Sequence, residues 1–144
     1  MNIKRFEDEI GYKFKNRKYL ERALTHSSYN REKNTKHQDN ERLEFLGDAF
    51  FDAIVSAELF HRMEKDAEGK LTKTRALIVC ENSLARAARN FDLGSYMYIG
   101  RGEEMAGGRN RASILADAME AVIGALYLDG GYEITRNFVL RPFS

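Results

Sequence analysis

The sequence predicts an all-α protein of a single domain, and three observations support this class. Apolar residues recur at helical spacing along most of the 144-residue chain. Strand-like alternation of apolar and polar residues is scarce, with one short stretch at Ser95–Ile99. The single proline is Pro142, so no proline interrupts a helix before the end of the sequence. With 43% hydrophobic and 31% charged residues, the composition is that of a soluble globular domain.

The apolar spacing places the expected helices in order along the chain. They lie at about Phe6–Ile10, Lys18–His26, Glu41–His61, Leu71–Cys80, Ser83–Phe91, Ser113–Leu128 and Tyr132–Leu140. Two longer polar or Gly-rich loops are expected between them, at residues 27–40 and 100–111.

Capping and turn residues set several of the expected helix ends. Asp39 or Asn40 should cap the long helix that follows. Gly94 is expected as the glycine that ends the helix before it. Asp129-Gly130-Gly131 is a turn signal that separates the last two helices.

The bulk properties favour a cytoplasmic protein without a membrane span. The lone cysteine, Cys80, excludes an internal disulfide and suits a reducing compartment. No signal peptide or transmembrane stretch is recognisable. The net charge is +1, but residues 1–38 carry an excess of positive charge and residues 39–144 an excess of negative charge. The basic first third of the chain is therefore a candidate border for a polyanionic ligand.

The stretch NERLEFLGDAF, residues 40–50, raises the question of a site because it mixes acids with large apolar residues. At about 100° per residue, Glu44 and Asp48 fall within about 60° of Glu41, and the apolar residues Leu43, Leu46, Phe50, Ala53 and Ala57 cluster opposite them. A solvated helix face would explain that pattern. However, Phe45 lies on the acidic side, and Gly47 stands in mid-helix, where another element packing closely would explain it.

A second helix strengthens the case for a site. Residues 112–128 contain two charges, Asp117 and Glu120, in an otherwise apolar segment that should be buried. Buried carboxylates are costly unless they are paired or bound to metal, and this helix contains no basic residue. If it packs against the helix of Glu44 and Asp48, four carboxylates meet. Such an all-oxygen set suits Mg²⁺, for which Mn²⁺ can substitute.

Two kinds of metal chemistry fit pooled carboxylates on helices. Di-iron helical proteins use Glu-x-x-His pairs, but the third residue after Glu44 is Gly47 and after Glu120 is Ile123. Hydrolytic two-metal phosphoryl transfer is therefore favoured over redox chemistry. His26 has no partner at ligand spacing and is interpreted as a structural histidine.

The residues now described resemble the catalytic domain of bacterial ribonuclease III, a double-stranded-RNA endonuclease. NERLEFLGDA, residues 40–49, is similar to the signature of that family. The segments ALTHSSY, EGKLTKTRALIV and the long run from Leu93 to Glu133 resemble the same domain in the same order. The resemblance covers nearly the whole chain. It implies one endonuclease domain over residues 1–144, with no double-stranded-RNA-binding domain in this chain.

The resemblance also implies residue roles. The metal-binding carboxylates would be Glu44, Asp48, Asp117 and Glu120, with Asp48 and Glu120 acting in catalysis. Glu41 and Glu68 match two further catalytic acids, and Phe45 matches an aromatic of a dimer interface. The family domain is an all-helical homodimer with a substrate cleft between its subunits. It leaves 5′-phosphate and 3′-hydroxyl ends with a short 3′ overhang, and it acts in rRNA and mRNA processing.

The Gly-rich stretch before the second acidic helix is a candidate RNA contact. Arg109, Asn110 and Ser113 precede or begin that helix, where glycines permit close approach and a helix N-terminus favours an anion. A solvated loop with Ser113 as an ordinary N-cap explains the same residues equally well. The alternative function, in another class, is a non-catalytic dimeric RNA-binding module on the same fold, against which the complete acid set argues.

Overall fold

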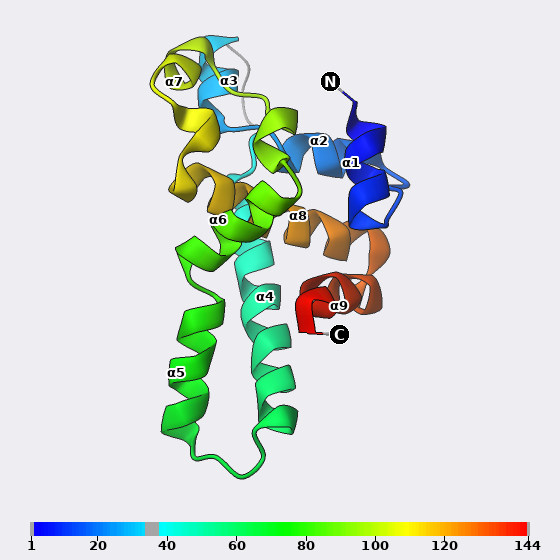
Figure 1. Ribbon diagram of the computed structural model, residues 1–144. Helices are drawn as coiled ribbons and strands as arrows, with labels where there is room; N and C mark the ends of the chain where they lie inside the picture. Colours follow the sequence, from blue (N-terminus) through cyan, green and yellow to red (C-terminus); the bar gives the residue numbers. More distant parts are fainter. Residues whose placement is uncertain (1, 34–37, 144) are drawn as a thin grey trace.

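The structure, a computed structural model, describes residues 2–33 and 38–143, and most of these residues lie in helices (Figure 1). The first half contains α1 (Ile3–Ile10), α2 (Arg17–Ala23), α3 (Ser27–Glu32), α4 (Glu41–Arg62) and α5 (Glu68–Ile78). The second half contains α6 (Glu81–Asn90), α7 (Arg101–Met105), α8 (Ala112–Gly130) and α9 (Tyr132–Leu140), with short 3₁₀ turns η1 (Leu93–Tyr96), η2 (Gly108–Asn110) and η3 (Arg141–Phe143). Within the described residues, extended pairing is limited to one bridge between Thr25 and Tyr98. The all-α prediction is confirmed.

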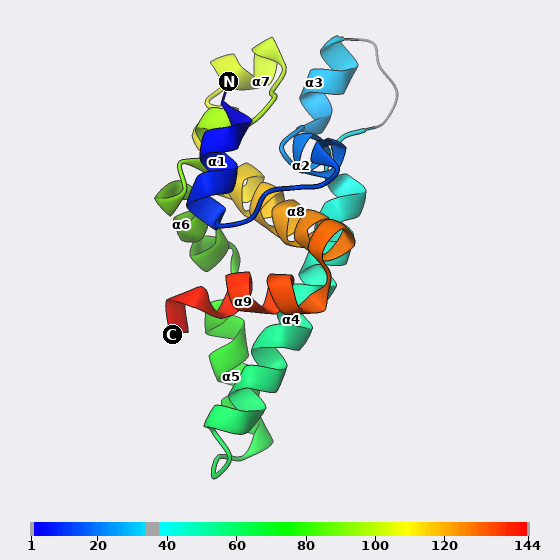
Figure 2. The same cartoon turned by 90° about the vertical axis from the view of Figure 1, so that its right-hand side faces the viewer.

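Helix α8 forms the centre of the core, and α2, α4, α6 and α9 pack against it (Figure 2). Every residue from Ala118 to Leu126 is buried, as expected for a helix that is apolar nearly all round. The most extensive contact between two helices is that of α4 with α8, followed by that of α6 with α8. The two acid-bearing helices of the sequence therefore do pack against each other.

Two glycines allow α4 and α8 to cross at backbone distance. A Cβ atom on Gly47 would lie 1.7 Å from the carbonyl oxygen of Glu120, and one on Gly124 would lie 2.4 Å from that of Leu43. Real Cβ atoms do not approach other atoms this closely, so neither position has room for a side chain. This close approach is the reason for the mid-helix glycine in the signature stretch, and it confirms the expectation of close packing there.

Polar contacts tie the N-terminal segment to this core. The carboxylate of Asp129, near the end of α8, accepts hydrogen bonds from the Tyr12 hydroxyl and from the backbone N–H groups of Lys15 and Asn16. The turn between α1 and α2 is thereby fixed against the C-terminal end of α8.

Helices α4 and α5 form a hairpin that extends away from the rest of the molecule (Figure 1). The structure describes every residue of α5, and none of them is buried. At 1.5 Å per residue, the 22 residues of α4 span about 33 Å. The α4–α5 turn therefore lies roughly one helix length from the start of α4.

The long expected helices are confirmed, with ends shifted by a few residues, but two expected loops contain helices. The stretch 27–40 includes α3, and 100–111 includes α7 and η2, so the prediction of plain loops is wrong for these segments. Residues 34–37 of the first expected loop lie outside the described residues. Gly94 does not end a helix, because it lies inside η1; the left-handed residue after α6 is Asp92, with φ of 53°. Asn40 is the N-cap of α4, but the side chain that accepts from the first helical N–H is that of Asp39.

The buried face of α4 is also different from the expected one. Its buried residues are Leu43, Gly47, Phe51, Ile54, Val55 and Leu59, whereas Ala53 and Ala57 are exposed. Glu44 and Asp48 each follow a buried residue of this stripe directly. The acids therefore lie beside the packed seam rather than opposite to it.

No helix in the described part of the chain has both the length and the apolar character needed to cross a membrane.

Candidate metal centre

Three carboxylates meet where α4 crosses α8. One carboxylate oxygen from each of Glu44, Asp117 and Glu120 lies within 4.8 Å of the others. Glu44 comes from α4, and the other two lie at i and i+3 on α8, on one side of that helix. The fourth expected ligand, Asp48, shares a hydrogen bond with Glu120 at the edge of this group. The structure thus groups three of the four predicted metal ligands and places the fourth, Asp48, in contact with Glu120.

The environment of Glu120 holds its carboxyl in the protonated form when no cation is bound. The residue is 9% exposed, although it is acidic. Burial, then the hydrogen bond and negative charge of Asp48, raise its pKa to about 9. An ionised carboxylate here would face the charges of Glu44 and Asp117 in a poorly solvated position, which explains the direction of the shift.

The pKa values of Glu44 and Asp117 are also raised, for similar reasons. Burial and the neighbouring Asp117 raise the pKa of Glu44 to about 7. Burial also raises the pKa of Asp117, and a hydrogen bond with Glu44 opposes that rise. Within the ranges that the structure covers, the ion pairs of Lys and Arg are formed with other acids. An unpaired, all-oxygen group of this kind fits a hard divalent cation such as Mg²⁺.

Of the two further expected acids, one lies near this group and the other does not. Glu41 is exposed in the first turn of α4, and its charge contributes to the raised pKa of Glu44. Glu68 begins α5, at the far end of the hairpin, where its carboxylate accepts a 2.5 Å hydrogen bond from the Thr72 hydroxyl. Within one chain, Glu68 cannot reach the carboxylate group.

Sequence reasoning missed one acid of this neighbourhood. Glu81, in the first turn of α6, lies close enough to Asp117 for its charge to contribute to the raised pKa of that residue. Its position after an apolar run gave no signal of this proximity, since the proximity arises from the packing of α6 on α8.

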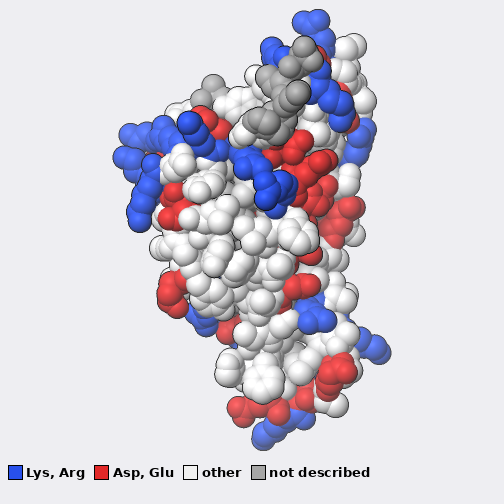
Figure 3. Space-filling model, turned by 180° about the vertical axis from the view of Figure 1, so that it is seen from behind, with Lys and Arg blue, Asp and Glu red and all other residues white. Residues whose placement is uncertain are grey.

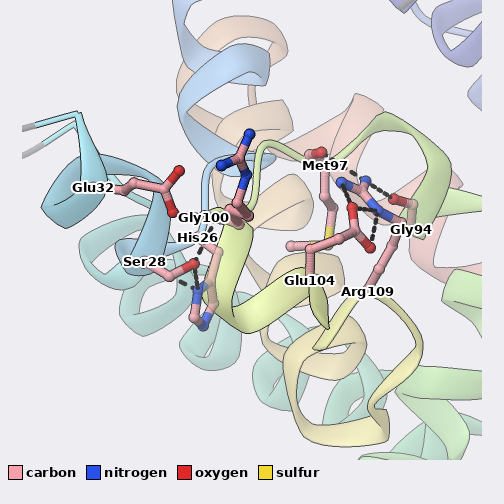
Figure 4. Close-up of polar contacts among 9 residues, drawn as sticks. His26, Ser28, Glu32, Gly94, Met97, Gly100, Glu104 and Arg109 are labelled. Carbon is pink, nitrogen blue, oxygen red and sulfur yellow. Dashed lines mark hydrogen bonds and ion pairs between the residues drawn. The ribbon is translucent and has the colours of Figure 1, made fainter. Parts of the chain in front are cut away.

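The arginine expected to contact RNA is instead engaged within the chain (Figure 4). The Arg109 guanidinium donates to Glu104 through Nε at 2.7 Å, and to the carbonyl oxygens of Gly94 and Met97 at 2.7 and 2.8 Å. Its neighbour Arg111 forms a 2.7 Å ion pair with Glu103.

The other two expected RNA contacts lie at and before the start of α8. Asn110 is exposed, and its carbonyl oxygen accepts from Arg89 at 3.3 Å. Ser113 is partly buried in the first turn of α8, and Arg111 is the N-cap residue of that helix. Ser113 is therefore not the N-cap that the sequence allowed as an alternative.

One face of the molecule carries a mixed charge. Figure 3 shows acidic side chains gathered in the upper right of one face, with Lys and Arg on either side and a broad uncharged area below. Phe45, the aromatic on the acidic side of α4, is 81% exposed. The side chain that the resemblance assigns to a dimer interface is therefore accessible on the surface of one chain.

Comparison with known proteins agrees with this architecture. The family model described as Ribonuclease-III-like matches residues 16–143. The chain belongs to the ribonuclease III family. It is 50% identical over 143 residues to Ribonuclease 3 of Clostridium tetani, covering 99% of this chain and 60% of that protein. It is 52% identical over 137 residues to Ribonuclease 3 of Syntrophomonas wolfei, covering 95% and 58%.

A solved ribonuclease III structure has the same fold. The nuclease domain of ribonuclease III from Campylobacter jejuni, described for structural flexibility in a region involved in dimer formation, superposes with a TM-score of 0.92 at 45% identity. That match covers 97% of this chain and 94% of the Campylobacter chain. The chain thus corresponds to a ribonuclease III nuclease domain and spans about 60% of the length of the curated relatives it matches.

Proposed function

We propose that this chain is a ribonuclease III endonuclease domain that hydrolyses double-stranded RNA with Mg²⁺ and leaves 5′-phosphate and 3′-hydroxyl ends with a short 3′ overhang. The observation that carries the proposal is the group of carboxylates at the α4–α8 crossing, which combines close spacing, burial and raised pKa values without a basic partner. Its family membership supports the same reaction.

In this proposal the carboxylates bind the metal ions, and the ions carry out the chemistry. Glu44, Asp48, Asp117 and Glu120 would hold the ions. Bound divalent ions would supply a hydroxide nucleophile from water and stabilise the charge on the leaving 3′ oxygen. The carboxylates need not transfer protons themselves, since their task is to fix the ions and to exclude other ligands. The duplex would be recognised by its A-form shape, 2′-hydroxyls and phosphates, so that sequence preference is weak.

The position of Glu68 supports the homodimeric part of the proposal. In one chain this acid lies about 30 Å from the start of α4, given the length of that helix. A second copy that covers Phe45 and the exposed hairpin would bring its own Glu68 toward this chain's carboxylates. The substrate cleft would then lie between the two subunits, with each site cutting one strand.

The test is gel cleavage of a long, perfect RNA duplex at low salt with Mg²⁺. Glu120→Gln keeps the shape of the side chain and removes one ligand charge. We expect it to lower the rate on the order of 10²- to 10³-fold, the range for losing one stabiliser of transition-state charge. Glu133→Gln, an exposed change in the first turn of α9, is the matched control and should cut like the parent.

The other outcomes separate the alternatives. A parent that binds the duplex but does not cut it would indicate the RNA-binding module. Equal cutting by the parent and Glu120→Gln would contradict the assignment of Glu120 as a metal ligand.

A further inference from the structure

The imidazole of His26 is held firmly at the start of α3, and it lies close to the carboxylate group. His26 is the N-cap residue of α3, where its Nδ1 accepts from the Ser28 backbone N–H at 3.1 Å. The same Nδ1 lies 2.8 Å from the Ser28 hydroxyl oxygen. That hydroxyl in turn accepts from the backbone N–H of Gly100 at 2.9 Å. Two segments that are 72 residues apart thus fix one ring.

These contacts determine which ring nitrogen carries the proton. A backbone N–H can only donate, so Nδ1 must be an acceptor. The Ser28 hydroxyl accepts from Gly100 and has its own proton available for Nδ1. A neutral imidazole that accepts at Nδ1 is protonated at Nε2. In Figure 4 the second ring nitrogen points away from Ser28, and no described residue hydrogen-bonds to it.

Backbone contacts place this ring beside the acid-bearing helices. The residue before it, Thr25, accepts from the N–H of Asn40 at 2.9 Å, and the Asn40 side chain donates to Ala23. Asn40 is the residue from which α4 begins, and its carbonyl accepts from the N–H of Glu44 at 2.8 Å. The turn that carries His26 is therefore bonded directly to the first turn of α4.

The electrostatics of Asp117 agree with this placement. Burial is the main cause of the raised pKa of Asp117, and His26 is among the neighbours that oppose the rise. The ring is thus near enough to α8, as well as to α4, to act on the same group of side chains.

The two arginines that precede α8 are engaged within the chain and do not offer a free donor to a phosphate. Arg109 is held by Glu104 and two backbone carbonyls, and Arg111 by Glu103. A phosphate that approaches four carboxylates meets a negative potential, so a donor at their edge is valuable. The Nε2–H of His26 is a fixed donor that this chain does not use internally.

We propose that His26 is a further catalytic residue, whose Nε2–H donates a hydrogen bond to a non-bridging oxygen of the scissile phosphate. The inference rests on the proposed function, because it needs a phosphodiester bound at the carboxylate group. It assigns the two ring nitrogens different tasks: Nδ1 caps α3, and Nε2 contacts the RNA.

Two substitutions separate these tasks. His26→Asn keeps an acceptor near the Nδ1 position, where asparagine is a good N-cap, and removes the Nε2 donor. His26→Gln places an amide N–H near the Nε2 position and loses the cap. We expect His26→Asn to melt like the parent but to lower single-turnover kcat/KM on a Mg²⁺-supplied RNA duplex by roughly 10- to 100-fold, the effect of losing one hydrogen bond to a charged group. His26→Gln should melt at a lower temperature and cut faster than His26→Asn.

His61→Asn is the matched control. His61 is exposed in the last turn of α4, far from the carboxylates, and its replacement should change neither rate nor melting temperature. The inference is overturned if His26→Asn cuts at the parent rate, or if His26→Gln is no more active than His26→Asn. A parent chain that does not cut at all would instead contradict the proposed function, so the two failures are distinguishable.

Discussion

Glu120 couples the stability of the metal-free protein to pH. Its pKa is about 9 in the folded chain, against 4.5 for an ordinary glutamate. The folded state therefore binds a proton that the unfolded state has released, over the range from about 4.5 to about 9. The contribution of the protonated carboxyl to stability is fully present below 4.5 and is lost progressively as pH rises through this range.

Glu120→Gln should therefore stabilise the metal-free chain at alkaline pH. Glutamine cannot ionise, so the cost of a buried charge disappears. We expect a melting temperature higher by a few degrees at pH 9, and a much smaller difference at pH 5. Circular dichroism melts in the presence of a chelator measure this, with exposed Glu133→Gln as the control. A difference that is the same at both pH values would contradict the assignment of a raised pKa to Glu120.

Mg²⁺ binding should release protons. At pH 7, Glu120 is mostly protonated and Glu44, with a pKa of about 7, is half protonated. Because a ligand carboxylate must be ionised, the affinity for Mg²⁺ should increase between pH 6 and pH 9. Calorimetric titration in two buffers of different ionisation enthalpy should show release of about one to two protons at pH 7. Proton uptake, or no exchange, would be the opposite of this expectation.

The crossing of α4 and α8 is the element on which the carboxylate geometry depends. Gly47→Ala would place a methyl group 1.7 Å from the Glu120 carbonyl oxygen and force the helices apart. We expect a loss of stability of about 3 kcal/mol or more, at the upper end of overpacking effects. Denaturant unfolding measures it.

Gly69→Ala is the matched control for that substitution, because Gly69 is also helical but has no atom within 4 Å of its Cβ position. It should stabilise the chain by roughly 0.5–1 kcal/mol, since alanine is the better helix former. Equal effects at the two positions would show that the crossing does not depend on Gly47.

The long helices and their acids could be predicted from sequence, because the signal is local. An apolar segment with two acids and no base, such as α8, predicts that the helix is buried, and it favours a cation beside the acids. The short helices could not be predicted, because distant residues complete them. The His26 ring that caps α3 is steadied through Ser28 by Gly100, and the first N–H of α7, from Arg101, is bonded to Glu32.

The roles of individual side chains also depend on contacts that the local sequence does not show. Arg109 was expected to contact RNA, but its side chain is bonded to Glu104, which lies five residues earlier. However, the carbonyls of Gly94 and Met97 that complete its environment are brought there by the tertiary fold. The role proposed for the second ring nitrogen of His26 depends on the packing of α4 beside the ring. That packing joins segments distant in sequence, so no local pattern predicts the role.

The whole molecule leaves a projecting hairpin and an exposed aromatic side chain open to a partner. The hairpin of α4 and α5 extends from the body, α5 buries no residue, and Phe45 is 81% exposed (Figure 1). Such a shape is common for a protomer whose core continues into a partner.

Phe45→Ala should therefore weaken self-association, with a shift from dimer to monomer at micromolar concentration in light scattering. A buried interface aromatic typically contributes about 2 kcal/mol or more, equivalent to a Kd raised at least about 30-fold. Met105→Ala is the control, because Met105 on α7 is also 81% exposed. A parent chain that is already monomeric at this concentration would contradict the dimer.

The contact between Gly47 and Glu120 also bears on how this site can be transferred or altered. Gly47 on α4 lies against the backbone of Glu120 on α8, and Gly124 lies against that of Leu43. The spacing of the carboxylates on the two helices therefore depends on both positions having no side chain. A designer who grafts the acids onto another helical scaffold without both glycines would obtain the right residues at the wrong separation. A graft would therefore have to include both crossed helices with their glycines, because the glycines set the separation of the carboxylates.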